Sequence, residues 1–589
     1  MKSKRINCLS FCGIYRKGLT AEEKYIFHDL ILSDITRLKD DTYFTTEGLD
    51  YLIIGKRLPA SCRTENISRS GGCAIVMLNN NNHTTKSNSS ADSFQHISSE
   101  FNSSWMTCFI DKSEEKVFFS RDPCGVQTVY VGNVNKSLLF TTSLTYFQQL
   151  KLELNTDAIN NLLHFLYIPS PQTIYQNIRS LLPGESISFD GTSSTFNSIP
   201  KTDQLDHSDF IHNPNNYIET YESLLSDAAN SHSSTSGKVG LFLSGGKDSS
   251  VLAIGAKLAN LKNIEAITLG FSDRSIDEGE DARCVANHLG IPFRILKISD
   301  QKYQKLWPIV VKDLGQPMGD FAVLPVYAAI EELKEEFDIF WDGTGTDLPF
   351  GIPASWIEKS IWWLKRYTPH FSTSNQLSMH RKIPPRFTRI ISMLERAKEE
   401  QFVSWNGWSS IEIAKMTGNS LNLKDTTLYK QYNICNSPMK LKTLTLTNIW
   451  ETETAYRKVV QSAESNGVIV RFPFLDNNLI SFTKHLPKRE HSHGNLNKVL
   501  LRKIIYNHLP KSIFDKPKGS FAFPKRIILN GNNYKLLCDY LSDDVVKRHG
   551  ILDSKVINQY IKEYKNGNNV LSDRIWIALM LHTWLEQAK

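Results

Sequence analysis

The chain has 589 residues, and this length predicts two to four domains. Hydrophobic residues make up 41% of the chain, so it can bury a full core and global disorder is excluded. The net charge of +7, from 68 basic and 61 acidic residues, is small for this length; it permits binding of phosphorylated small molecules and does not require nucleic acid.

We expect residues 1–195 to form an N-terminal domain. The segment Phe11-Cys12-Gly13-Ile14-Tyr15 resembles the Cys-Gly-Ile start of N-terminal-nucleophile glutaminase domains, which have an αββα fold. In that family the cysteine is the first residue of the mature chain, and its thiol attacks the amide of glutamine. Cys12 is therefore a candidate catalytic nucleophile if the chain is cleaved before it. A structural cysteine is the alternative.

Other parts of this domain favour the fold but not the chemistry. The Asn-Gly-Glu and Gly-Asp-x-Glu segments that hold glutamine in the family are missing. The segment Arg121-Asp122-Pro123-Cys124-Gly125 resembles the family's Arg-Asp-x-x-Gly turn, and residues 138–144 resemble its next strand. We therefore expect a glutaminase-type fold that has lost its glutaminase activity.

A second domain, expected over residues 216–589, carries a phosphate-binding pattern near its start. Residues 239–243 are mostly apolar and predict a buried parallel strand. The turn Ser244-Gly245-Gly246-Lys247-Asp248-Ser249-Ser250 follows and leads into an apolar-periodic helix. Free N–H groups and the positive end of the helix dipole bind phosphate at such a junction. The turn is neither a Walker A loop nor a dinucleotide fingerprint, because both glycine spacings are absent.

This heptapeptide resembles the pyrophosphate loop of the asparagine synthetase family of ATP pyrophosphatases. Such enzymes cleave ATP between the α- and β-phosphates, place AMP on a carboxylate and release pyrophosphate. The resemblance implies that the seven loop residues, with Leu243 before them, bind the nucleotide. It also implies that the backbone at the end of the next strand, at Leu269, meets the adenine.

Strands and helices alternate after this loop, which predicts a doubly wound parallel sheet with ligands at the carboxyl ends of its strands. One strand, 337–341, runs into Asp342-Gly343-Thr344-Gly345-Thr346-Asp347, which resembles the family's second nucleotide loop. Asp248 and Asp347 then end neighbouring turns, and carboxylate oxygens are preferred ligands of Mg²⁺. We therefore expect Mg²⁺ at this aspartate pair, with Gly343 and Gly345 beside ATP.

Thr344 departs from the family and is a candidate catalytic residue only by its position. Asparagine synthetases have glutamate there, and β-lactam and carbapenam synthetases have a tyrosine that works with a glutamate to deprotonate an amine. A threonine hydroxyl is not a base near neutral pH, so another group takes the proton or the nucleophile arrives unprotonated. Glu451, Glu453 and Tyr456 are candidates for this role; an exposed acidic helix face is the alternative for the glutamates.

Residues 516–521, with the sequence Lys-Pro-Lys-Gly-Ser-Phe, resemble the family's Arg/Lys-x-Lys-x-x-Phe loop. The catalytic lysine of that loop corresponds to Lys518. A fixed cation would stabilise charge on the α-phosphate and on a later tetrahedral oxyanion, and losing such a group costs on the order of 10²–10³ in rate.

Together these features predict an enzyme that binds Mg·ATP, adenylates a small-molecule or peptide carboxylate and forms an amide. The nitrogen comes from glutamine or ammonia, as in asparagine synthetases, or from an amine of the substrate, as in β-lactam synthetases and lasso-peptide cyclases. A catalytically inactive ATP-binding scaffold is the alternative from another class.

The remaining sequence features concern location and assembly. The nine cysteines form no Cys-x-x-Cys pair, and no apolar run reaches 18 residues. The basic N-terminus is followed by no apolar signal region. These observations indicate a cytoplasmic protein with reduced thiols and no membrane or nucleic-acid partner; a homodimer is compatible with them.

Overall fold

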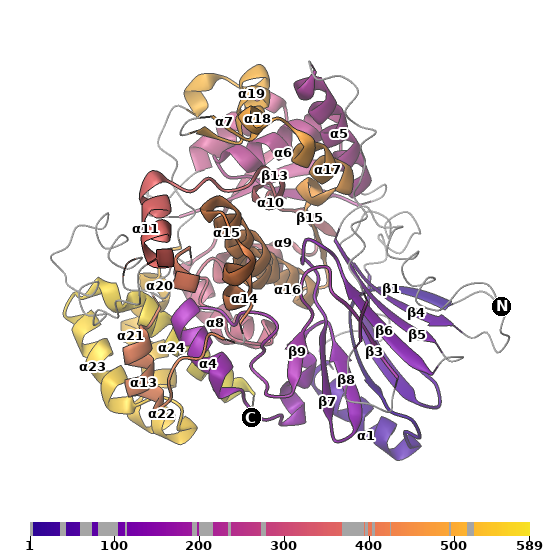
Figure 1. Ribbon diagram of the computed structural model, residues 1–589, viewed down its shortest axis with the longest axis vertical. Helices are drawn as coiled ribbons and strands as arrows, with labels where there is room; N and C mark the ends of the chain where they lie inside the picture. The colour runs from indigo at the N-terminus through magenta and orange to yellow at the C-terminus, as the bar shows by residue number, and fades with distance from the viewer. Residues whose placement is uncertain are drawn as a thin grey trace.

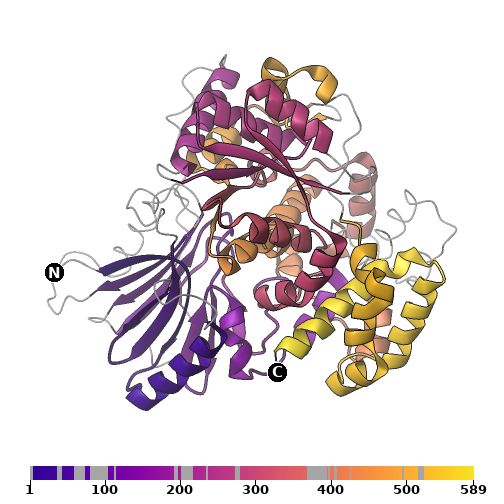
Figure 2. The same ribbon diagram turned by 180° about the vertical axis from the view of Figure 1, so that it is seen from behind.

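The computed structural model describes residues 4–35, 43–58, 73–79, 104–111, 115–190, 197–199, 216–233, 237–271, 279–367, 394, 398–402, 407–424, 426–493, 496–514 and 523–588. Two sheets organise these residues, one in the N-terminal third and one in the middle of the chain (Figure 1). Seen from behind, the N-terminal strands and the C-terminal helices lie on opposite sides of the molecule, below the second sheet (Figure 2).

The N-terminal sheet has 11 strands within the described residues. They are β1 (Lys4–Tyr15), β2 (Tyr43–Glu47), β3 (Tyr51–Arg57), β4 (Cys73–Asn79), β5 (Trp105–Asp111), β6 (Lys116–Arg121), β7 (Tyr130–Val134), β8 (Ser137–Thr141), β9 (Ile178–Ser180), β10 (Ser186–Phe189) and β11 (Asn197–Ile199). The order is β11-β10-β6-β5-β4-β1-β8-β7-β9, and β3 joins β2 to β1. The first half of β1 pairs with β4 and its second half with β8, so β1 ties the two halves together.

Two helices accompany this sheet: α1 (Ala21–Ile35) packs against β3 on one face, and α4 (Thr156–Phe165) packs against α13 (Ser410–Thr417) and α24 (Ser572–Gln587) of the C-terminal region. Their apolar residues share a hydrophobic core with Cys12 and Ile14 of β1. The opposite face of β1, with Phe11 and Tyr15, belongs to a separate core between the strands. Alternate residues of one strand therefore serve two cores, as the period of a β-strand requires.

The second sheet has five parallel strands in the order β14-β13-β12-β15-β16. They are β12 (Val239–Phe242), β13 (Ile264–Gly270), β14 (Phe293–Lys297), β15 (Ile339–Trp341) and β16 (Ile469–Arg471). One face packs against α5 (Tyr217–His232), α6 (Lys247–Leu258), α7 (Gly279–Leu289) and α19 (Val499–His508). The other face packs against α9 (Val323–Leu333) and α16 (Arg457–Ser465). The predicted fold class, a doubly wound sheet after a glutaminase-type domain, is confirmed.

The remaining elements surround this sheet and form the C-terminal helical region. They are α8 (Asp300–Asp313), α10 (Asp347–Phe350), α11 (Trp356–Tyr367), α13 (Ser410–Thr417), α14 (Thr427–Ile434), α15 (Pro438–Thr445), the π-helix Leu446–Tyr456, α17 (Asn477–His485), α18 (Lys488–His491), the hairpin of β17 (Ser492–His493) and β18 (Leu496–Asn497), α20 (Arg526–Leu529), α21 (Gly531–Leu541), α22 (Asp543–His549), α23 (Ser554–Lys565) and α24 (Ser572–Gln587). Among the helices that the structure describes, none combines the length and the apolar character that crossing a membrane would require.

The two domains meet along α16, which lies in the middle of the molecule beside the N-terminal strands (Figure 1). Ser143 Oγ donates a hydrogen bond to Gln461 Oε1 at 2.9 Å. Lys56 Nζ donates to the carbonyl of Glu464 at 3.3 Å. Burial raises the pKa of the Glu464 carboxyl to about 7, and the charge of Lys56 partly offsets this effect. The interface is therefore polar as well as buried.

His232, at the end of α5, makes the free energy of unfolding depend on pH. Burial, with the charge of Arg471, lowers the pKa of this fully buried imidazole to about 3. An unfolded histidine has a pKa of about 6.5, so below that pH the unfolded chain binds a proton that the folded chain does not. We expect this residue to lower the free energy of unfolding by about 2 kcal/mol between pH 7 and pH 5.

The His232→Asn variant isolates this contribution. Asparagine does not titrate, and its amide group can replace the ring N–H that faces the carbonyl of Ala228 at 2.8 Å. Urea unfolding at pH 7 and pH 5 should show a smaller loss of stability for the variant than for the unmodified protein. Equal losses would show that His232 is not the group responsible.

Candidate active site

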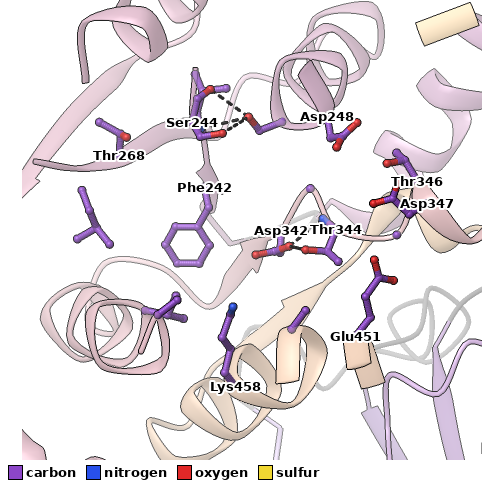
Figure 3. A pocket seen from close by; sticks show the side chains of 18 of the residues that line it. Phe242, Ser244, Asp248, Thr268, Asp342, Thr344, Thr346, Asp347, Glu451 and Lys458 are labelled. Atoms are coloured by element: carbon purple, nitrogen blue, oxygen red, sulfur yellow. Dashed lines mark hydrogen bonds between the residues drawn. The ribbon is translucent and has the colours of Figure 1, made fainter. Parts of the chain in front are cut away.

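A cavity of about 390 Å³ opens at the carboxyl ends of β12, β13 and β15 (Figure 3). This is where parallel α/β sheets bind ligands. The lining residues combine an apolar wall with hydroxyl and carboxylate groups: Phe242, Leu243, Ser244, Asp248, Ser249, Ile267, Thr268, Leu269, Ala322, Val326, Asp342, Gly343, Thr344, Gly345, Thr346, Asp347, Trp450, Glu451, Ala455 and Lys458.

The turn between β12 and α6 is held in shape by its own serines. The backbone N–H of Ser244 donates to Ser249 Oγ at 3.1 Å, and the N–H of Gly246 donates to Ser244 Oγ at 3.1 Å. Ser250 Oγ donates to the carbonyl of Gly246 at 2.8 Å. These bonds fix a loop at the N-terminus of a 12-residue helix, whose first N–H groups and dipole favour an anion.

Asp248 and Asp347 come from different turns and meet at one ammonium group. Lys498 Nζ lies 3.0 Å from Asp248 Oδ2 and 2.8 Å from Asp347 Oδ1. It also donates to Thr346 Oγ1 at 2.7 Å. Burial alone would lower the pKa of Lys498, but the two aspartates outweigh burial and raise it. The lysine is therefore a fixed cation between two carboxylates.

The backbone of Lys498 is itself unusual. It adopts the left-handed conformation, with φ 52° and ψ 50°, immediately before α19. A non-glycine residue rarely adopts this conformation, and such strain is concentrated at functional sites. The surrounding contacts with Asp248 and Asp347 hold the residue in this geometry.

The second loop packs directly on the first. A Cβ added at Gly343 would lie 3.1 Å from the Cα of Ser249, so the two loops are in close contact. Within this loop Asp342 Oδ1 accepts hydrogen bonds from the backbone N–H of Thr344 at 2.8 Å and from Thr344 Oγ1 at 2.5 Å (Figure 3). Thr344 therefore donates its hydroxyl proton to a hydrogen bond with Asp342 and can only accept hydrogen bonds from a ligand in the cavity.

The opposite wall comes from the π-helix Leu446–Tyr456 and from α16. Glu451 points into the cavity from the π-helix (Figure 3). Burial, with the charge of Asp347, raises the pKa of Glu451 to about 8. Tyr456 Oη donates to Glu451 Oε2 at 3.1 Å from behind. Next to them Lys458 Nζ forms a 2.7 Å ion pair with Asp320.

The aspartate pair fits a divalent cation. Asp248 Oδ1 is buried and accepts no hydrogen bond from the residues that the structure describes, so among these an oxygen of the preferred kind is left unsatisfied. The second carboxylate, Asp347, is about one-third exposed toward the cavity. Among the described residues, no three His, Cys, Asp or Glu side chains form a ready cluster of metal ligands. The remaining ligands would have to come from phosphate and water.

Comparison with known proteins agrees with this geometry. Residues 220–586 match the asparagine synthase family, and residues 90–198 match the glutamine amidotransferase domain family. The family match to residues 220–586 covers more than half of the chain. The chain belongs to the asparagine synthase family.

Three relatives show how distant the similarity is. The asparagine synthetase [glutamine-hydrolyzing] 1 of Bacillus subtilis is 22% identical over 494 residues, which are 80% of this chain and 76% of that protein. A putative asparagine synthetase [glutamine-hydrolyzing] of Mycobacterium tuberculosis is 22% identical over 502 residues, 80% of this chain and 75% of that protein. A putative asparagine synthetase [glutamine-hydrolyzing] 2 of Methanocaldococcus jannaschii is 26% identical over 258 residues, 43% of this chain and 50% of that protein.

Within this asparagine synthase family member, the structure gathers many of the residues expected at the site. The cavity is lined by Leu243, Ser244, Asp248, Ser249, Leu269, Gly343, Thr344, Gly345 and Asp347. The other loop residues that we expected to contact the nucleotide, Gly245, Gly246, Lys247 and Ser250, belong to the turn or the first turn of α6 but are not among the lining residues. Lys518 lies outside the described residues.

The expectation for Glu453 is corrected by the structure. Glu453 does not line the cavity. Its buried carboxylate lies 3.8 Å from the guanidinium of Arg457 and also interacts electrostatically with Arg121 of the N-terminal domain. Glu451, two residues earlier, is the carboxylate that faces the cavity. The two glutamates point to opposite sides because they lie about half a turn apart on one helix.

For Cys12, the structure favours the structural alternative over the catalytic one. Cys12 lies inside β1, where it pairs with Ile54 of β3 and Thr141 of β8, and its side chain is fully buried. Burial raises the pKa of its thiol well above the ordinary value, so the thiolate is disfavoured. Cleavage before Cys12 would also remove the half of β1 that pairs with β4. A structural cysteine is the reading that the geometry supports.

A labelling experiment checks this. Cys12 should stay unmodified when the folded protein is treated with a thiol reagent, whereas the exposed Cys284 and Cys538 should react. Peptide mapping after the reaction distinguishes the three sites, and denatured protein serves as the positive control. Rapid labelling of Cys12 in the folded state would contradict its burial and reopen its role as a nucleophile.

The sequence reading missed Lys498 as a member of the site. No nearby pattern in the sequence connects it with the aspartates. Lys458 was missed for the same reason, since its ion-pair partner, Asp320, lies 138 residues away in the sequence. Asp342 was missed although its bonding partner, Thr344, is only two residues away.

Proposed function

We propose that this protein is an ATP-dependent ligase that adenylates a carboxylate, releases pyrophosphate and then forms an amide as a nitrogen nucleophile displaces AMP. One observation carries this proposal. Asp248 and Asp347 converge within 3.0 Å of a single ammonium group, beside a phosphate-type loop and inside an open cavity. Membership of the asparagine synthase family supports the same reaction class.

The phosphate side of the cavity has the groups that adenylation needs. The turn Ser244–Ser249 and the N-terminus of α6 would hold the β- and γ-phosphates, and Lys498 would offset their charge as pyrophosphate leaves. When bound, Mg²⁺ would neutralise phosphate charge, with Asp248 and Asp347 as its protein ligands. The apolar wall formed by Phe242, Ile267 and Leu269 would take the adenine.

The opposite wall has the groups that amide formation needs. The attacking nitrogen must lose a proton, and Glu451 is the carboxylate on that wall that can accept it. Tyr456 orients Glu451 by its hydrogen bond. Thr344 is not a base, since its hydroxyl is already donated to Asp342. Lys518, from the loop that resembles the family's catalytic lysine loop, is the further cation that we expect to stabilise the oxyanion.

The nitrogen source is ammonia or an amine of the substrate in this proposal. The relatives carry the words glutamine-hydrolyzing in their names. In this chain the cysteine that would hydrolyse glutamine is fully buried inside a strand. This observation favours free ammonia or a substrate amine over glutamine.

The test measures pyrophosphate release from ATP and Mg²⁺ in the presence of candidate carboxylates, with ammonium, glutamine or a linked amine as the nitrogen source. Pyrophosphate and AMP in equal amounts, dependent on a carboxylate, support the proposal. Release of inorganic phosphate and ADP instead would overturn the AMP-forming step. Tight ATP binding without turnover across the whole panel would favour the inactive scaffold.

A further inference from the structure

The segment that carries Glu451 is a π-helix of 11 residues, Leu446–Tyr456. π-helices are rare, usually only one turn long, and common at functional sites. The local sequence weakens the α-helical alternative, because it is rich in threonine. Thr452 Oγ1 donates to the carbonyls of Asn448 and Ile449, and Thr454 Oγ1 donates to the carbonyl of Trp450. Such side-chain bonds to the preceding turn compete with regular backbone bonds.

The π-helical register is what brings Tyr456 to Glu451. The two residues are five positions apart, and Tyr456 Oη donates to Glu451 Oε2 at 3.1 Å. In a π-helix residues i and i+5 are stacked, because the backbone bonds join the same positions. In an α-helix they would lie about 140° apart around the axis, and side chains at i and i+5 do not face each other. The pair therefore exists only while the register is kept.

The N-terminal domain contacts this π-helix through one of its own loop turns. Gly125, in the segment Arg121–Gly125, approaches Thr452 so closely that a Cβ at Gly125 would lie 2.8 Å from Thr452 Cγ2. Val126, the next residue, shares a hydrophobic cluster with Tyr456. The charge of Arg121 also acts on Glu453, on the face of the helix that points away from the cavity.

The turn that makes these contacts is rigid. The guanidinium of Arg121 donates to the carbonyls of Gln127 at 2.6 Å, Leu181 at 2.5 Å and Gly125 at 2.6 Å. Asp122 accepts bonds from the backbone N–H groups of Val126 at 3.3 Å and Gln127 at 3.0 Å. All of these groups are buried, so their hydrogen bonds keep the turn from deforming where it contacts the helix.

We propose that the N-terminal domain is a buttress for the active site: its turn at Gly125 holds the π-helix in register and so keeps Tyr456 bonded to Glu451 on the cavity wall. Gly125 is then a positioning residue. The buttress itself is a structural inference. Its effect on catalysis rests on the proposed function, because only that reaction gives the Tyr456–Glu451 pair a task. A glutaminase-type domain without an accessible cysteine would in this way still be required for amide formation.

The test compares Gly125→Ala with the control Gly18→Ala. Both glycines have a left-handed backbone, with φ of +72° and +71°, so both variants carry the same backbone penalty. Gly125→Ala drives a methyl group toward Thr452 Cγ2 and toward Pro183 Cγ, whereas no atom of the described part of the chain lies within 4 Å of a Cβ at Gly18. A difference between the two variants therefore reports the contacts with Thr452 and Pro183 together, and the Thr452→Ser change described below isolates the contact with the π-helix.

Hydrogen exchange, followed by mass spectrometry, tests the buttress without any substrate. Gly125→Ala is expected to increase the exchange rate of peptides within residues 446–456 roughly tenfold, since the register is disturbed, while Gly18→Ala leaves them unchanged. Equal exchange in both variants, or an increase spread over the whole chain, would overturn the buttress. Adding Thr452→Ser, which removes the contacted methyl and keeps the hydroxyl, should restore part of the protection.

Kinetics test the consequence for catalysis. Gly125→Ala should lower the rate of amide formation roughly 10- to 100-fold, while ATP–pyrophosphate exchange and the KM for ATP stay near those of Gly18→Ala, because the phosphate loops are untouched. Equal losses in both half-reactions would overturn the link to the Tyr456–Glu451 pair. If the unmodified protein shows no turnover, the proposed function fails, and hydrogen exchange alone still decides whether the buttress exists.

Discussion

Asp347→Asn is expected to lower carboxylate-dependent pyrophosphate release by a factor on the order of 10²–10³. The substitution keeps the size of the side chain at the start of α10 but removes one of the two carboxylate charges that meet at Lys498. Since a divalent cation prefers charged oxygen ligands, the Mg²⁺ concentration needed for half-maximal rate should rise as well. Rates measured over a range of Mg²⁺ concentrations check both effects.

The matched control is Asp553→Asn. Asp553 caps α23 by accepting bonds from the N–H groups of Lys555 and Val556, and asparagine caps a helix equally well. Asp553 does not line the cavity, so its variant should keep its activity within about twofold of the unmodified protein. Unimpaired turnover in Asp347→Asn, or equal losses in the two variants, would remove Asp347 from the proposed metal site.

Lys498→Met is expected to have the second large effect, and it should act on stability as well as activity. The variant leaves Asp248 and Asp347, both partly exposed to the cavity, facing one another without the ammonium that separates them. Since solvent screens these carboxylates, the loss of stability should be smaller than the about 3–5 kcal/mol that removing one partner of a fully buried ion pair costs. Pyrophosphate release should fall by a factor on the order of 10²–10³, because the cation that offsets phosphate charge is gone.

Mg²⁺ gives this variant a diagnostic response. With the ammonium absent, the two carboxylates can bind a divalent cation without competition, and a ligand that binds only the folded state stabilises it. Thermal unfolding of Lys498→Met should therefore shift upward with Mg²⁺ alone by more than that of the unmodified protein. Lys503→Met, in the helix α19 that directly follows Lys498, is the control, since Lys503 pairs with Glu490 at 2.7 Å outside the cavity. A Mg²⁺ response equal to that of the control would argue against a metal site at the two aspartates.

Much of the phosphate side of the site could be predicted from sequence, because it is local. The turn Ser244–Ser250 is contiguous, and its place between a strand and a helix follows from apolar periodicity. The pairing of Asp248 with Asp347 could be predicted from topology, since β12 and β15 are parallel neighbours whose carboxyl ends share one edge. The fold class followed from the same alternation of strands and helices.

The rest depends on contacts that no short pattern encodes. Lys498 comes from a different element, and only the folded chain places its ammonium between the aspartates. The choice between Glu451 and Glu453 depends on the rotation of one helix, and a π-helical register is not visible in the sequence of polar and apolar residues. Cys12 was ambiguous because an N-terminal nucleophile and a buried strand cysteine have the same local sequence.

The two faces of the segment from Glu451 to Glu464 also limit whether the N-terminal domain can be removed or replaced by another domain. One face, with Glu451 and Lys458, belongs to the cavity; the other, with Gln461 and Glu464, is bonded to Ser143 and Lys56 across the domain boundary. A chain shortened to its second domain would uncover those buried polar groups. A domain with an active glutaminase could replace the native N-terminal domain only if its surface offered hydrogen-bonding partners for Gln461 and Glu464. The two domains thus depend on each other for the burial and hydrogen bonding of this segment.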